Sequence, residues 1–195
     1  MVSSQVIADA RRLAGSLGQL PAPEAKPTIV VVSGLPGTGK SSFSRRLAER
    51  LPFVILESDA LRKALFAEPT YSATESARLF NTIHFLIDGL LKKGMPLILD
   101  ATNLSERYRE RIYSIADHRQ ARLILVLVQA PPGVVQERLK ARAGRRDSSE
   151  SSEADWAVYE KLKTTAEKIR RNHFVVDTSR DITPIIEKIV REASR

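Results

Sequence analysis

Glycines, a lysine and two serines stand close together between Gly34 and Ser42, in the order G-x-x-x-x-G-K-S-S. This spacing is that of a P-loop, whose backbone N–H groups surround the phosphates of a nucleoside triphosphate. Glycines let the backbone curl without side chains in the way, and the positive end of the following helix attracts anions. We expect Lys40 to reach the β and γ oxygens of ATP and the Ser41 hydroxyl to bind Mg²⁺. The predicted nucleotide-binding residues are Gly34, Leu35, Pro36, Gly37, Thr38, Gly39, Lys40, Ser41 and Ser42.

The neighbours of this loop support the prediction. The apolar run "TIVVVS" (28–33) precedes it and is typical of a strand, and "KSSFSRRLAERL" (40–51) follows it with the pattern of a helix. A P-loop requires this strand-loop-helix order. The dinucleotide spacing G-x-G-x-x-G is absent, and the absence of a guanine-reading N-K-x-D sequence disfavours a GTPase.

Two carboxylates follow predicted strands. Asp100 ends the run "PLILD" (96–100), where a Walker B aspartate helps to hold Mg²⁺; the alternative, a cap for the next helix, is weaker because Ser105 is the better cap residue. Asp59, in "LESDALRKAL" (56–65), is placed to accept the proton of an attacking hydroxyl. Arg62 lies one helical turn further on and shares that face. From position alone, a helix cap beside a surface arginine explains Asp59 and Arg62 equally well.

The segments "GLPGTGKSS" (34–42), "ESDALRK" (57–63) and "LILDATNLSERYRERI" (97–112) together carry a family resemblance. They resemble the small P-loop kinases around the 5′-kinase domain of phage polynucleotide kinase, which include zeta-toxin-like kinases, antibiotic phosphotransferases and gluconate-kinase-like enzymes. The resemblance spans roughly residues 28–180. It implies that Asp59 is the general base and that Arg62 contacts the acceptor. It also implies that Asp100, Thr102 and Asn103 line the acceptor and metal region.

The resemblance further implies an arginine-bearing lid at about residues 138–158, beginning in "VVQERLKARAGRRD" (134–147). Arg138 and Arg142 are four residues apart on one face of a predicted helix, and one of them is expected to stabilise the moving phosphoryl group. Arg145 and Arg146 follow in the predicted loop. Gly144 and the serine run after it are expected to provide a hinge. The alternative for "RAGRRDSSESSEAD" (142–155) is a disordered surface loop.

The segment "VVDTSRDITP" (175–184) follows the last predicted strand. In similar kinases the loop after this strand packs beside the nucleotide base, which makes Asp177, Thr178 and Ser179 candidates for the adenine pocket. A helix cap is the alternative interpretation of the same residues.

Five short apolar runs alternate with amphipathic segments, at 28–33, 53–56, 96–100, 122–128 and 173–177. Such alternation predicts a parallel sheet with helices on both faces. The expected fold is a three-layer α/β/α P-loop NTPase of the nucleotide-kinase type, with a five-stranded sheet in the order 2-3-1-4-5. A helix is predicted over residues 1–20, joined by the proline-rich stretch 20–27 to a kinase domain spanning 28–195. The helix lies outside the family resemblance, and either packing on the core or a dimer contact explains it.

The composition limits the remaining possibilities. The chain of 195 residues has no cysteine and three histidines, so a zinc site is not expected. No apolar run approaches the length of a membrane span, and the expected location is the cytoplasm. The net charge of +8 is compatible with a nucleic-acid partner.

These patterns predict a Mg²⁺-dependent enzyme that moves the γ-phosphate of ATP to a hydroxyl acceptor. Lys40, Asp59, Arg62, Arg138 and Arg142 are its expected catalytic residues, and Ser41 and Asp100 its metal ligands. The acceptor, a small molecule or a nucleic-acid end, is left open, and the specific alternative is a polynucleotide 5′-hydroxyl kinase. A non-catalytic nucleotide-sensing module is the third hypothesis. The oligomeric state is also left open.

Overall fold

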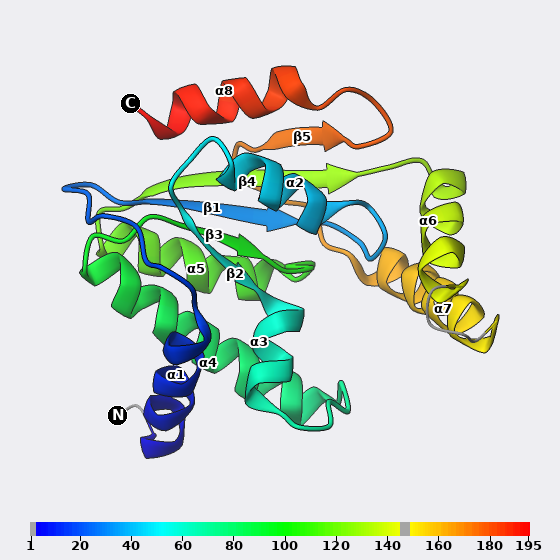
Figure 1. Ribbon diagram of the computed structural model, residues 1–195, viewed down its shortest axis with the longest axis horizontal. Helices are drawn as coiled ribbons and strands as arrows, with labels where there is room; N and C mark the ends of the chain where they lie inside the picture. The colour runs from blue at the N-terminus through cyan, green and yellow to red at the C-terminus, as the bar shows by residue number, and fades with distance from the viewer. Residues whose placement is uncertain (1–2, 145–148) are drawn as a thin grey trace.

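The computed structural model of the chain describes residues 3–144 and 149–195. Five parallel strands form one sheet in the order β2-β3-β1-β4-β5, which confirms the predicted fold class and strand order (Figure 1). The strands are β1 (Thr28–Ser33), β2 (Val54–Glu57), β3 (Leu97–Asp100), β4 (Arg122–Gln129) and β5 (Phe174–Asp177).

Side chains that alternate along the central strand β1 enter two separate apolar cores. Ile29 and Val31 join the core on one face of the sheet, whereas Val30 and Val32 join the core on the other. All four are fully buried, as expected for a strand that is covered on both faces. The sheet is therefore the middle layer of three.

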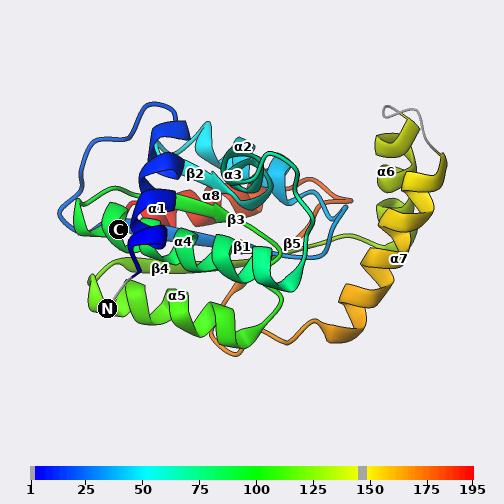
Figure 2. The same ribbon diagram turned by 90° about the horizontal axis from the view of Figure 1, so that it is seen from below.

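Helices on one face are α1 (Ser4–Ser16), α3 (Ser58–Leu65), α4 (Ala73–Lys92) and α5 (Glu106–His118). Helices on the other face are α2 (Lys40–Ala48) and α8 (Thr183–Ala193). Both layers can be followed in Figures 1 and 2. No helix in the two described ranges is long and apolar enough to cross a membrane.

Helix α1 is shorter than the predicted helix over residues 1–20. It begins after Ser3, whose side chain accepts a hydrogen bond from the N–H of Val6, and its C-cap is Leu17. Leu13 is fully buried in the core beneath α3 and α4. Asp9 forms a two-pronged ion pair with Arg78 of α4, with distances of 2.7 and 2.8 Å. Of the two explanations for this helix, the structure shows packing on the core.

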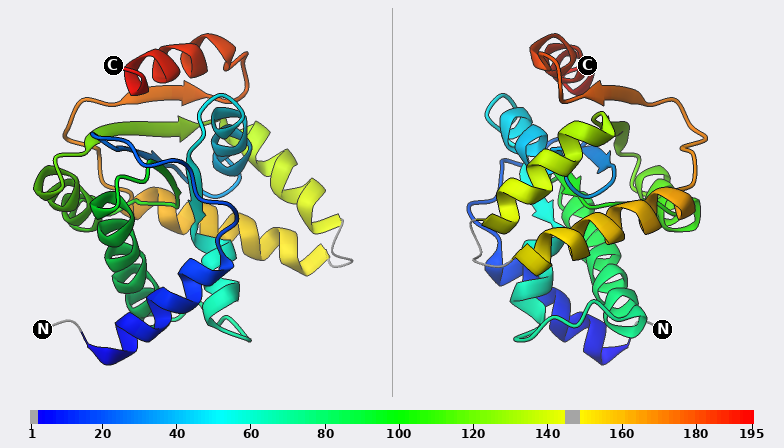
Figure 3. Two further views of the ribbon diagram at one scale, coloured as in Figure 1. Left: turned by 60° about the vertical axis from the view of Figure 1, so that its left-hand side comes forward. Right: turned by 90° about the vertical axis from the view of Figure 1, so that its right-hand side faces the viewer.

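Helices α6 (Pro132–Gly144) and α7 (Ser149–Thr165) form a hairpin that stands to one side of the sheet (Figures 2 and 3). For residues 142–155 the sequence allows both a basic lid and a disordered loop; in the described part of that stretch, residues 142–144 end α6 and residues 149–155 begin α7. The run of serines suggested a loop, whereas the glutamate and alanine residues that follow are compatible with a helix. Trp156 stacks on Tyr159 within α7, with ring centroids 4.8 Å apart.

Candidate active site

The predicted P-loop connects β1 to α2 and has the backbone geometry that its glycines allow. A Cβ on Gly34 would lie 2.3 Å from the carbonyl oxygen of Val128, so only glycine fits there. Gly39 is the N-cap of α2 and has a φ of 92°, a region that side chains disfavour. Helix α2 therefore starts at Lys40 with its N–H groups directed at the loop.

Lys40 is turned back onto its own loop. Its Nζ donates a hydrogen bond of 3.0 Å to the carbonyl oxygen of Leu35. Burial lowers the pKa of the Lys40 ammonium, and the carboxylates of Asp100 and Asp59 oppose this shift. Both predicted carboxylates thus act on the lysine through space, which is consistent with the expectation that these side chains share one site.

Asp100 is 3% exposed and ends β3 beside the P-loop. Burial raises the pKa of this carboxyl, although Ser41 and Lys40 act in the opposite direction. Its Oδ2 has no hydrogen-bond partner within the described residues. A buried carboxylate oxygen without a partner is costly unless a ligand satisfies it.

Glu57 was not among the predicted site residues. It ends β2 directly opposite Asp100 in the parallel register, and its Oε1 accepts a hydrogen bond of 3.3 Å from the Ser41 hydroxyl. The signal in the sequence was a carboxylate at the end of an apolar run, the same signal that identified Asp100. Its role depends on the register between β2 and β3, which the sequence does not reveal.

Mg²⁺ is the ion that a P-loop implies, and these residues fit it. Ser41, Asp100 and Glu57 offer hard oxygen ligands, and one of those oxygens is buried and unpartnered. Within residues 3–144 and 149–195, no three His, Cys, Asp or Glu side chains lie close enough to hold a metal by themselves. Phosphate oxygens and water would therefore have to complete the coordination.

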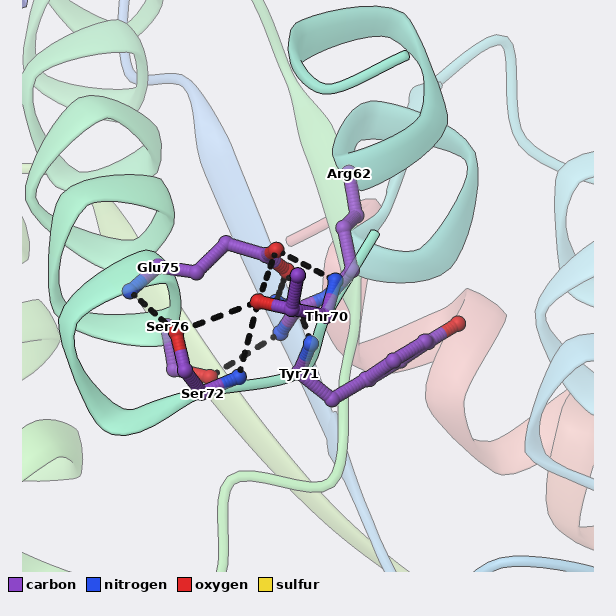
Figure 4. Close-up of polar contacts among 6 residues, drawn as sticks. All are labelled: Arg62, Thr70, Tyr71, Ser72, Glu75 and Ser76. Atoms are coloured by element: carbon purple, nitrogen blue, oxygen red, sulfur yellow. Dashed lines mark hydrogen bonds and ion pairs between the residues drawn. The ribbon is translucent and has the colours of Figure 1, made fainter. Parts of the chain in front are cut away.

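Asp59 and Arg62 lie on α3 but point to different environments. Asp59 is exposed in the first turn of the helix. Arg62 is buried and pairs with Glu75 of α4, and it also donates a hydrogen bond of 3.3 Å to the Ser76 hydroxyl (Figure 4). The structure therefore joins Arg62 to α4 rather than to Asp59.

Glu75 is the centre of this network, which the sequence analysis did not identify. Burial would raise the pKa of its carboxyl, but hydrogen bonds from Thr70, Arg62 and Tyr71 outweigh that effect and lower the pKa to about 2. Its Oε2 accepts from the N–H of Thr70 at 2.6 Å and from the Thr70 hydroxyl at 2.9 Å. The network thus fixes the connection between α3 and α4.

Thr102 and Asn103, predicted to line the acceptor region, support the P-loop. The carbonyl oxygen of Thr102 accepts a hydrogen bond of 3.1 Å from the N–H of Gly34. Asn103 is buried with a φ of 46°, and its amide donates at 3.1 Å to the carbonyl oxygen of Val32. In this arrangement the Asn103 amide group positions the loop after β3 against β1.

Arg138 and Arg142 of α6 line a cavity of about 350 Å³ beside the P-loop, together with Gly39, Ser42 and Thr178. Arg138 donates to the hydroxyl and the carbonyl oxygen of Thr178, at 2.8 and 2.9 Å. The Thr178 hydroxyl in turn donates to the carbonyl oxygen of Thr38 at 2.6 Å. Arg138 and Thr178 therefore link α6, the loop after β5 and the P-loop.

The other two candidates for the adenine pocket form a turn. The Oδ1 of Asp177 accepts hydrogen bonds from the N–H and the hydroxyl of Ser179, at 2.9 and 2.6 Å. Only Thr178 of these three residues lines the cavity. Arg145 and Arg146 lie outside the described residues.

The α6–α7 hairpin packs on the P-loop through a small apolar cluster. Val135, Leu139 and Tyr159 are buried there, and Leu35 of the P-loop packs against them. The α6–α7 hairpin is therefore in direct contact with the phosphate loop.

The parallel sheet, its strand order and the glycine-rich loop before α2 define the chain as a P-loop NTPase of the α/β class. A family model described as an AAA domain matches residues 29–169, and the chain belongs to this AAA_33 family.

Two relatives show the range of similar sequences. A UPF0200 protein of Saccharolobus solfataricus is 29% identical over 143 residues, which are 69% of this chain and 75% of that protein. A cytidylate kinase of Aeropyrum pernix is 27% identical over 178 residues, which are 85% of this chain and 98% of that protein.

Solved structures share the fold. A gluconokinase from Sinorhizobium meliloti has a TM-score of 0.58 at 24% identity, covering 87% of this chain and 91% of its own. An APS kinase from Mycobacterium tuberculosis has a TM-score of 0.63 at 18% identity, covering 89% and 100%. Together with the family match, these neighbours confirm the expected resemblance to small P-loop kinases.

Proposed function

We propose that the protein is a kinase that transfers the γ-phosphate of ATP to a hydroxyl group of a second substrate. The observation that carries this proposal is a set of carboxylates at the ends of β2 and β3: Glu57 and Asp100 lie opposite each other, and Glu57 accepts a hydrogen bond from Ser41 of the P-loop. Asp59 follows two residues later, in the first turn of α3. A module that only binds nucleotide does not require a carboxylate at the position of Asp59. The family and its kinase relatives support the same conclusion.

The N–H groups of the P-loop and the Lys40 ammonium hold the phosphates of ATP in this proposal. Lys40 exchanges its bond to the Leu35 carbonyl oxygen for the phosphate oxygens. Mg²⁺, when bound by Ser41, Asp100 and Glu57, neutralises charge on the phosphates. The Arg138–Thr178 bridge forms one wall of the base pocket.

Asp59 is the proposed general base. It accepts the proton of the acceptor hydroxyl as the new oxygen–phosphorus bond forms and the bond from the γ-phosphorus to ADP breaks. Asp59 is exposed in the first turn of α3, so its carboxylate is accessible for this proton transfer. Arg142 is the lid arginine that we expect to stabilise the transferring group, because Arg138 is already held by Thr178.

The acceptor has two candidate classes. A small hydroxylated molecule fits the gluconokinase-like fold. A polynucleotide 5′-hydroxyl fits the net charge of +8. In the second case binding should weaken steeply with salt, whereas a neutral sugar should bind with little salt dependence.

A transfer screen with γ-labelled ATP tests the proposal. Oligonucleotides with 5′-hydroxyls, nucleosides, sugars and aminoglycosides serve as acceptors, and the Asp59→Asn protein serves as the blank. We expect label in one class with the native protein, and about 10²–10⁴-fold less with Asp59→Asn at unchanged ATP affinity. Equal transfer by both proteins would show that Asp59 is not the base. ATP binding without transfer to any acceptor would favour the nucleotide-sensing module.

A further inference from the structure

Tyr71, in the connection between α3 and α4, combines an exposed aromatic ring with an unusual backbone. Its side chain is 60% exposed. Its φ is 54°, in the left-handed region that a bulky residue seldom adopts. Backbone strain of this kind persists only where the surroundings enforce it, and it is concentrated at functional sites.

The surroundings that enforce this conformation are the Glu75 network (Figure 4). The Glu75 carboxylate accepts hydrogen bonds from the N–H groups of Thr70 at 2.6 Å and Tyr71 at 3.3 Å. The Ser72 hydroxyl caps α4 by accepting from the N–H of Glu75 at 3.3 Å. Three consecutive residues are thus tied to the first turn of one helix, and the Tyr71 ring is held at a fixed place.

Arg62 supports one face of that ring. Its guanidinium carbon lies 4.6 Å from the ring centroid of Tyr71, a cation–π contact. Arg62 itself is buried and paired with Glu75, so its charge is already compensated within the protein. The exposure of the ring leaves its surface away from Arg62 available to a ligand.

The Tyr71 ring lies against α3, the helix that carries the proposed general base. Its contact there is Arg62, which follows Asp59 by one turn of that helix. Because Glu75 neutralises Arg62, this region is poorly suited to grip an anionic group of the acceptor. An aromatic face backed by a cation suits a flat ring instead.

We propose that Tyr71 is a stacking platform for a planar heterocyclic ring of the acceptor, such as the base of a nucleoside or of a nucleotide end. This inference rests on the proposed kinase function, and it narrows the acceptor to a base-bearing molecule. Stacked on Tyr71, the ring directs the hydroxyl on its sugar toward Asp59.

A purely structural cover over Arg62 would behave differently. A cover would bury its ring, and it would not need the left-handed backbone. Tyr108 offers the comparison within this chain: it is 42% exposed, but its ring packs against Phe80 at a centroid distance of 5.6 Å. Tyr108 therefore supplies a matched control.

The test measures binding separately from transfer. A short single-stranded DNA with a free 5′-hydroxyl and a 3′ fluorophore is titrated into the Asp59→Asn protein in the presence of a non-hydrolysable ATP analogue, with fluorescence anisotropy as the readout. Tyr71→Ala is expected to weaken binding by about tenfold or more, Tyr71→Phe to retain it, and Tyr108→Ala to leave it unchanged. Unlabelled nucleosides compete if the ring alone is recognised, whereas only oligonucleotides compete if the backbone is also required.

The outcomes separate this inference from the function on which it rests. Native-level binding by Tyr71→Ala overturns the stacking platform, as does transfer to sugars but to no base-bearing acceptor; the kinase function survives both results. If the native protein does not bind the ATP analogue, the proposed function itself is overturned. Thermal unfolding of each variant checks that the fold is retained.

Discussion

The phosphate-binding side of the site, residues 34–42 with α2, keeps its shape through its backbone, whereas the acceptor side, α3 with its connection to α4, depends on the side chain of Glu75. On the first side, glycine geometry and helix α2 define the loop. On the second side, one carboxylate holds Arg62, Thr70 and Tyr71 together. The site for a shared substrate such as ATP thus carries a recognisable contiguous motif, while the acceptor side depends on one side chain that joins two helices.

The largest expected effect is on the phosphate-binding side. Lys40→Ala removes the ammonium that neutralises the phosphates, so transfer should fall by about 10²–10³-fold and ATP affinity should also fall. Turnover with labelled ATP and equilibrium nucleotide binding measure the two effects. Unchanged values would contradict the P-loop assignment.

Asp100→Asn should also impair transfer, by about 10²-fold, and should weaken the dependence on Mg²⁺. The same substitution should raise the stability of the nucleotide-free protein. Burial raises the pKa of the Asp100 carboxyl, so ionisation of this group destabilises the folded protein. The loss of stability begins as the pH rises past the unfolded pKa of about 3.9, and it is complete above the folded pKa. The neutral asparagine lacks this loss, and the variant should melt at a higher temperature near pH 7 without nucleotide. A lower melting temperature would show that Asp100 is not destabilising in the free protein.

Glu75→Gln addresses the acceptor side. It leaves the buried Arg62 guanidinium without its counter-charge, so we expect the melting temperature to fall by about 5 °C or more. ATP affinity should stay within about twofold, because the P-loop does not depend on Glu75. Calorimetry measures the melting temperature and nucleotide titration measures the ATP affinity. A loss of ATP affinity well beyond twofold would contradict the independence of the phosphate-binding side from Glu75.

His84, on the same helix, makes the stability of the fold depend on pH and is not expected to change transfer at pH 7. It is 3% exposed within α4, and burial, with a smaller contribution from Arg111, lowers its pKa to about 4. A lowered histidine pKa contributes stability above the unfolded value of about 6.5, and that stability is lost as the pH falls toward 4. The loss amounts to about 3 kcal/mol below pH 4. His84→Leu should remove this part of the acid sensitivity, as denaturant unfolding between pH 7 and 4 would show. If the free energy of unfolding falls with pH equally in the native protein and the variant, His84 is not its cause.

Most of the fold was predictable, because the apolar runs are continuous and the helices between them are amphipathic. Residues 34–42 were predictable as a site because a contiguous motif carries them, and Asp100 because it ends a strand. Glu57 was missed since its role depends on the register of β2 against β3. Glu75 and Tyr71 were missed since they act on Arg62 only once α4 packs against α3. The sequence leaves the stretch 142–155 open between a lid and a disordered loop because its serines form no apolar pattern, whereas in its described part the structure ends α6 and begins α7.

The stacked pair of Trp156 and Tyr159 has a practical consequence. The chain has a single tryptophan, and it stands on the lid. Intrinsic fluorescence excited at the indole therefore observes one place in the molecule, without any attached dye. Stopped-flow mixing with ATP would report any change around Trp156 in real time, and comparison with the rate of transfer would show whether that change precedes the chemical step.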